Sequence, residues 1–280
     1  MHFLARKRKK FLIISIGLAL IIFLLILNYF ERIEFVYKAG KQIQKIELRS
    51  EKDTTITLVN IGEGNREYIA NLIERITSCN PKVVAVDVFF IDRKDKGQDN
   101  HLAEAIGKGC TILATKGYGN GLFVESHSKF KNRSKDSGIV QLFDHAGIVM
   151  TYRPIRKMND PNESTIEHFS YVVAKTYDSI LAKAYIEDVN LDTEYYIDFQ
   201  YKQQNFKVYD YLDSAFNCED INGKIVVLGY LGPSNEDKFM TPLGLMNTKE
   251  YNPKIGNMYG AVILSNIILS ILQGRTPEGY

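Results

Sequence analysis

The longest apolar run of the chain lies near its N-terminus, where residues 11–30 read FLIISIGLALIIFLLILNYF and contain no charged side chain. At a helical rise of about 1.5 Å per residue, such a run spans roughly 30 Å, which is the thickness of a bilayer core. It is longer than the apolar region of a cleavable signal peptide and does not end in small residues. The pattern therefore predicts one uncleaved transmembrane helix in the lipid bilayer.

A dense basic flank precedes this run, because positions 6–10 read RKRKK. Basic residues beside a first membrane helix are retained in the cytoplasm. We therefore expect residues 1–10 to be cytoplasmic, the chain to cross the inner membrane once, and the main domain to be periplasmic or otherwise extracytoplasmic.

Beyond this anchor, residues 31–54 place apolar positions at roughly helical spacing among charges, which indicates a juxtamembrane stalk or helix. From residue 55 onward, short β-type runs alternate with amphipathic helical ones. Asn65 stands where a helix cap is needed, and Asn80-Pro81 ends that helix. The pattern predicts strands at 55–62, 82–90 and 110–117 and helices at 65–79 and 99–109.

The second half continues this alternation after a polar stretch at 118–137, which we expect to be a long loop. Ser265, Asn266 and Ser270 interrupt the last apolar segment, so it is typical of a buried core helix and not of a second membrane span. The pattern predicts strands at 147–155, 194–199 and 224–231 and helices at 165–181 and 260–274.

This order of elements predicts an α/β domain over residues 55–275, followed by a tail at 276–280. A β-α-β-α-β succession is typical of a doubly wound, mostly parallel sheet flanked by helices, with right-handed crossovers. One N-terminal transmembrane helix would precede the domain.

Charge and cysteine content narrow the class of protein. The net charge of +2 is concentrated in the basic flank, so no nucleic-acid partner is expected. Cys79, Cys110 and Cys218 are all expected near the amino-terminal edge of the sheet, and a Cys79–Cys110 disulfide is our hypothesis. No spacing of residues indicates a metal or cofactor site, and the charged segment 92–100 is expected to be a solvated loop.

Two acidic residues are predicted at one edge of the sheet. Asp87 lies near the carboxyl end of an apolar strand, where open α/β sheets bind ligands. Asp237 and Lys238 follow another strand and are expected at the same edge. The alternative is structural: Asp87 would accept hydrogen bonds from a loop, so that Asp87→Asn is destabilising, and Asp237 would cap its own turn.

A second candidate site is the segment GEGNRE at 62–67, between a strand and a helix. The helix N-terminus would hold an anion with help from Arg66, or the segment would serve as a turn and cap. It lacks the third glycine of a dinucleotide loop, and the chain contains no G-x-S-x-G nucleophile motif. We therefore do not expect an enzyme, and in an enzyme Asp87 and Asp237 would be the acid/base pair.

Four stretches of the sequence stand out as motifs: ITLVNIG (56–62), NPKVVAVDVFF (80–90), GKIVVLGYLGPSNEDKFMTPLG (223–244) and YGAVILSNIILSILQGR (259–275). Together they resemble the CHASE2 family of extracytoplasmic sensory domains from bacterial signalling proteins. The third is the most specific, because family members carry a D-x-F-x-T-P motif there, and Asp237 and Thr241 match it. Where members end their first strand in an acid, this chain has Gly62, and Glu63 would take that role.

The resemblance implies a sensor for an unidentified small-molecule or peptide stimulus, which signals through membrane helices to a kinase or cyclase domain. No motif of such an output domain occurs up to Tyr280. We therefore expect a membrane-protein signalling partner or an output domain beyond this sequence, and a homodimer through the anchor. The alternatives are an envelope scaffold that kept the fold without a ligand pocket, and an extracytoplasmic enzyme.

Overall fold

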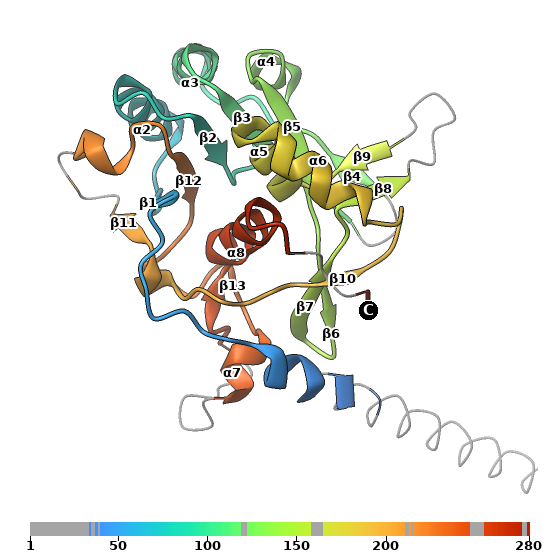
Figure 1. Ribbon diagram of the computed structural model, residues 1–280. Helices are drawn as coiled ribbons and strands as arrows, with labels where there is room; N and C mark the ends of the chain where they lie inside the picture. Colours follow the sequence, from blue (N-terminus) through green and yellow to red (C-terminus); the bar gives the residue numbers. More distant parts are fainter. Residues whose placement is uncertain are drawn as a thin grey trace, which may run out of the picture. The chain divides into compact units, whose positions relative to one another are not determined.

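The computed structural model describes residues 34, 37–38, 40–118, 122–157, 165–210, 213, 216–246, 255–275 and 279–280 (Figure 1). The chain divides into two units, residues 1–45 and 46–280. In the first unit the described residues are helical up to Lys45. The basic flank and the predicted membrane helix at 11–30 lie outside the described residues. In the described part of the chain, no helix combines the length and the apolar character that a membrane crossing requires.

The second unit is built around a mostly parallel sheet, in which β3–β4 is the one antiparallel pair among the described strands. In spatial order the strands are β11 (Lys207–Tyr209), β1 (Ile56–Asn60), β12 (Ile225–Gly229), β2 (Val83–Val86), β3 (Thr111–Gly117) and β4 (Phe123–Val124), and β5 (Asp136–Val140) also pairs with β3. The predicted α/β class, with a parallel-rich sheet between helices, is confirmed.

Helices cover both faces of this sheet (Figure 1). On one face lie α2 (Arg66–Ser78) and α3 (Lys96–Lys108), and on the other lie α5 (Phe169–Tyr177), α6 (Ser179–Glu187) and α8 (Gly260–Leu272). Successive strand residues point to opposite faces. In β12, Ile225 and Val227 accordingly join the α5–α8 layer, whereas Val226 and Leu228 join the α2–α3 layer. Burial on both faces explains why these strands read as continuous apolar runs.

Local sequence signals place the helix ends. The Asn65 side chain accepts the N–H of Tyr68 at 2.9 Å and caps α2, as predicted. The predicted helix at 165–181 is wrong in extent, because Asp178 ends α5 and its carboxylate caps α6. Its first residues belong instead to β9 (Thr165–Glu167), which pairs with β8 (Ile155–Lys157).

The buried α8 confirms the core helix predicted at 260–274. Its polar Asn266 is satisfied inside the domain, because its amide oxygen accepts the N–H groups of Gln200 and Tyr201 at 3.0 and 2.8 Å. Its amide nitrogen donates to the Tyr201 carbonyl at 2.9 Å. These bonds fasten the segment that leads into β11 against α8, which lets a polar side chain occupy the core without an unsatisfied group.

The expected loop at 118–137 is more structured than its composition indicates. It contains β4, α4 (Ser128–Lys131) and the start of β5. The strand predicted at 147–155 is shorter in the structure, where it forms β7 (Ile148–Tyr152). β7 pairs with β6 (Leu142–His145) and β10 (Tyr195–Tyr196) in a separate antiparallel sheet. The remaining elements are β13 (Lys238–Phe239), β14 (Met258–Tyr259), α7 (Pro242–Met246) and the 3-10 turns η1 (Gln203–Asn205) and η2 (Cys218–Asp220).

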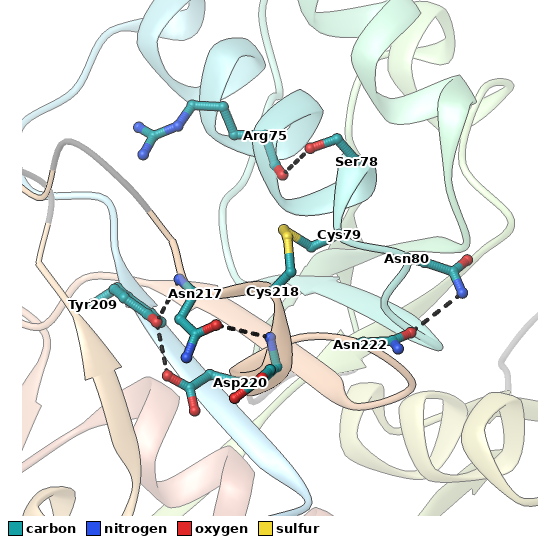
Figure 2. The surroundings of a disulfide bond; sticks show 10 residues. Arg75, Ser78, Cys79, Asn80, Tyr209, Asn217, Cys218, Asp220 and Asn222 are labelled. Atoms are coloured by element: carbon teal, nitrogen blue, oxygen red, sulfur yellow. Dashed lines mark hydrogen bonds between the residues drawn. A yellow bond between two sulfur atoms is a disulfide. The ribbon is translucent and has the colours of Figure 1, made fainter.

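A disulfide joins Cys79, directly after α2, to Cys218 at the start of η2 (Figure 2). Cys110 is a half-buried free thiol, and burial raises its pKa. The predicted Cys79–Cys110 bridge is therefore wrong. The segment that leads into β12 lies against the end of α2, where the N–H of Gly223 donates to the carbonyl of Asn80 at 3.0 Å.

We predict that alkylation in denaturant without a reductant modifies one thiol per chain, that of Cys110, and that reduction raises the number to three. The bridge joins residues 139 positions apart. Replacing both Cys79 and Cys218 by serine should therefore lower the free energy of unfolding by about 2–4 kcal/mol. Cys110→Ser is the matched control. Three modified thiols in the non-reduced protein, measured by intact mass, would contradict the pairing.

Candidate ligand-binding site

The two aspartates predicted at one edge of the sheet are brought together by β2 and by the segment after β12. Asp87 follows β2 directly, and its N–H donates to the carbonyl of Leu228 at 2.8 Å. Asp237 stands in the turn before β13, with a φ of 58°. The N–H of Gly260, the first residue of α8, donates to the Asp237 carbonyl at 3.0 Å. The start of α8 is therefore fastened beside both acids.

Both carboxyl groups line one cavity, which we call the acidic cavity. Its volume is about 510 Å³, within the range of sites for small molecules. The described residues that line it are Asp87, Phe89, Lys116, Gly117, Val140, Gln141, Leu142, Phe143, Asp144, Val149, Asp237, Phe239, Gly260 and Leu264. These residues come from the carboxyl ends of β2, β3 and β5, from β6 and β7, from β13 with the turn before it, and from the start of α8.

Two glycines permit this close approach. A Cβ atom at Gly229, the last residue of β12, would lie 2.7 Å from the Cβ of Ala261 in α8. A Cβ atom at Gly260 would lie 2.9 Å from Oδ2 of Asp237. Larger residues at these positions would push α8 away from the strand end or displace the Asp237 carboxylate.

Neither carboxyl group in the acidic cavity has a compensating partner among the described residues. Asp87 and Asp237 accept no hydrogen bond and form no ion pair there, so the loop that we expected to donate to Asp87 is not found. Burial, and then the negative charge of Asp237, raises the pKa of Asp87 to about 7. Asp87 is half-buried, whereas Asp237 is exposed to solvent at the cavity. Partial loss of hydration of its carboxylate raises the pKa of Asp237 to about 6. The pair is therefore able to hold a proton near neutral pH.

Lys116 and Asp144 complete the charged lining, and the sequence did not single them out. Lys116 lies near the end of β3, with its ammonium 5.4 Å from the centre of the Tyr118 ring. The sequence could have identified Lys116, because this residue follows the buried run TILAT and therefore lies at the same sheet edge as Asp87. Asp144 lies on β6, which the sequence pattern did not predict as a strand.

Arg66, the expected anion ligand, does not reach the acidic cavity. Its guanidinium forms a buried ion pair with Asp99 and donates to the carbonyl of Asp92. Both side chains of the pair are buried, at 7% and 0% exposure. Asp99 lies in the segment expected as a solvated loop, which instead forms the first turn of α3 behind the cap Asp95. Arg66 therefore connects α2 to α3.

Glu63 and Lys238 also lie apart from the paired aspartates. Glu63 lines a separate pocket of about 300 Å³ with Gly64, Tyr68 and Pro233. The ammonium of Lys238 donates to the side-chain oxygen of Asn235 at 2.9 Å and lies 4.7 Å from the centre of the Tyr259 ring. Of the five residues predicted to bind a ligand, the structure brings together Asp87 and Asp237.

The geometry defines the class of protein as an α/β domain with a ligand-sized cavity at the carboxyl edge of its sheet. The CHASE2 domain model matches residues 17–279. The chain therefore belongs to the CHASE2 family, whose members are extracytoplasmic sensory domains in signal transduction, and the resemblance seen in the sequence is confirmed. No curated protein and no solved structure matches the chain.

The raised pKa values make a prediction about stability. Because the folded pKa of Asp87 is about 7 and its ordinary value is 3.8, the folded protein keeps a proton that the unfolded chain loses between these values. The stabilisation is present below pH 3.8 and is lost as pH rises through about 7. Asp87→Asn, which imitates the protonated acid, should therefore stabilise the protein at pH 8 and change little at pH 4.

We expect a gain of about 1–3 kcal/mol at pH 8, because one pKa unit corresponds to about 1.4 kcal/mol and water in the cavity screens part of the charge. Chemical denaturation at both pH values measures it. Asp136→Asn, at an exposed position outside the cavity, is the matched control. A loss of stability in Asp87→Asn at pH 8 would instead support the structural role first considered for this residue.

Proposed function

We propose that this chain is a membrane-anchored, extracytoplasmic sensor that binds a small-molecule or peptide stimulus in the acidic cavity. The observation that carries the proposal is the cavity itself, where Asp87 and Asp237 face open space without a partner among the described residues. A carboxylate that loses water without gaining a partner lowers the stability of the fold. Such groups are therefore more typical of functional sites than of purely structural positions. Membership of a family of sensory domains supports the same conclusion.

The sequence supports the anchor and its orientation. The apolar run at 11–30 has the length of a membrane helix, and the basic flank favours a cytoplasmic N-terminus. The Cys79–Cys218 disulfide fits an oxidising compartment. These features favour a single crossing of the cytoplasmic membrane, with residues 46–280 in the periplasm or outside the cell.

The β6–β7 hairpin offers a route from the cavity to a signalling partner. Leu142 and Phe143 of β6 line the cavity, and β7 pairs with β10. Tyr195 of β10 also pairs with Gly279. A ligand that draws the hairpin toward Asp87 would therefore move a sheet that includes the last described residues. We infer that this movement reaches a membrane-protein partner or an output domain, within a homodimer or a larger complex.

We favour binding over catalysis because the described residues that line the cavity include no serine, cysteine, histidine or threonine to act as a nucleophile or a shuttle. The paired aspartates would still serve as the acid/base pair of an enzyme. The chemical fate of the ligand distinguishes the two functions, because a sensor releases its ligand unchanged and an enzyme converts it.

A cavity-filling variant tests the proposal. Leu142→Trp should occupy the acidic cavity, and Leu191→Trp, at a 53% exposed residue outside it, is the matched control. We expect that some members of a metabolite and peptide panel raise the melting temperature of the full-length chain in detergent by several degrees. A ligand at 100 times its Kd adds about 2.7 kcal/mol of stability.

The stabilisation should persist in Leu191→Trp and vanish in Leu142→Trp, provided that both variants melt cooperatively. Mass spectrometry should recover the ligand unchanged after incubation. If no stabilisation depends on residue 142, the scaffold alternative is correct, and conversion of the ligand would establish an enzyme.

A further inference from the structure

We propose that the ligand of the acidic cavity is an organic cation, an ammonium group carried on an apolar body. This inference rests on the proposed function, because it names the chemistry that the same cavity would recognise. Three observations carry it: the balance of charge in the lining, the absence of partners for Asp87 and Asp237 among the described residues, and the aromatic walls.

The charge of the lining favours a cation. Among the described residues that line the cavity, three carry carboxyl groups (Asp87, Asp144 and Asp237) and one, Lys116, is cationic. An anionic ligand would be attracted by Lys116 and repelled by the ionised carboxylates of the lining. A ligand ammonium placed between Asp87 and Asp237 would supply the ion pairs that the protein itself does not provide, and charge-assisted hydrogen bonds are about twice as strong as neutral ones.

Two arginines contact residues of the lining, and they do not reverse this balance: Arg153 lies over the Phe143 ring, and Arg156 bonds to Gln141. Arg153 donates to Glu194 at 3.0 Å, and Arg156 donates to the side-chain oxygen of Gln141 at 2.7 Å. Glu194 also bonds to His145. Arg156 keeps its positive charge because Gln141 is neutral, yet with Arg156 counted the described carboxyl groups at the cavity still outnumber the cations.

The walls favour an organic body over a metal ion. The rings of Phe89, Phe143 and Phe239 line the cavity, and the remaining surface is mostly aliphatic, from Val140, Leu142, Val149 and Leu264. Aromatic faces attract organic cations, and aliphatic side chains cover an apolar body. Among the described residues, no three histidine, cysteine or acidic side chains come together closely enough to hold a metal ion.

Because binding is linked to proton release, the proposal predicts the direction in which affinity changes with pH. A cation binds the ionised form of the Asp87–Asp237 pair, so its binding releases the proton held near neutral pH. Affinity for a cation should therefore rise with pH between about 6 and about 8, as the pair loses its proton. A ligand that prefers the neutral or protonated pair would show the opposite dependence.

Three probes of matched size separate the alternatives: 2-phenylethylamine, 2-phenylethanol and 3-phenylpropionate, which are cationic, neutral and anionic. Isothermal titration calorimetry on the full-length chain in maltoside detergent measures their binding. We expect the amine to bind at millimolar or lower concentration at pH 8, and about tenfold more weakly at pH 6, because a pKa near 7 leaves about a tenth of Asp87 ionised there. The alcohol and the carboxylate should bind at least tenfold more weakly than the amine.

Variants locate the interaction. Asp87→Asn and Asp237→Asn should each weaken amine binding at least tenfold, and Asp136→Asn, outside the cavity, should leave it unchanged. Two acid variants are used so that a folding defect in one leaves the other to decide. Titration in two buffers of different ionisation enthalpy should show proton release on binding of the amine.

Three results would overturn the inference in different ways. If the carboxylate or the alcohol binds as tightly as the amine, or if binding of the amine takes up protons, the cavity is a ligand site but its preference for a cation is wrong. If the amine does not bind while other compounds stabilise the protein through residue 142, the cation is again wrong and the proposed function stands. If nothing binds in either experiment, both proposals fail.

Discussion

The fold and its candidate site depend on the insertion of β12 between β1 and β2. β12 pairs in parallel with both strands, although most of the domain separates it from them in the sequence. The chain that leaves β12 therefore emerges beside the end of β2, where Asp87 lies. Its next turn places Asp237 at the same edge, and α8 then begins against Gly229 and returns across the sheet. One strand pairing thus determines the core, the cavity and the meeting of the two acids.

This arrangement stabilises the domain in one place and destabilises it in another. Residues 260–271 of α8 are buried throughout, so the helix that follows β12 contributes much of the apolar core. The start of the same helix lies beside two acids to which no described residue donates a hydrogen bond. The partial positive charge of a helix N-terminus favours a nearby ionised acid, typically by about 0.3–1 kcal/mol at a surface site. For the half-buried Asp87, that is smaller than the cost of the burial that raises its pKa. A fold that retains such a conflict commonly does so at a functional site.

Strong periodicity made part of this structure predictable. The buried strands, the Asn65 cap, the apolar α8 and the meeting of Asp87 with Asp237 all follow from local patterns and from the shared edge of parallel strands. Strand order does not follow from such patterns, and it determines which cysteines pair. The short strands β4 and β6 carry too few residues for a periodic signal, so Asp144 on β6 was missed. Arg66 was misplaced because burial of Asp99 depends on the packing of α2 against α3.

The central claim is that the fold keeps Asp87 and Asp237 as two coupled carboxyl groups with raised pKa values, which line one open cavity and are available to a ligand. Nuclear magnetic resonance of the full-length chain with carbon-13-labelled aspartate carboxyls tests it most directly, with Asp87→Asn and Asp237→Asn used for assignment. The account predicts that the pair titrates in two steps, near pH 6 and pH 7, and that the Asp87 step moves to lower pH when Asp237 is neutralised. Titration of both groups near the ordinary value of 3.8 would contradict it.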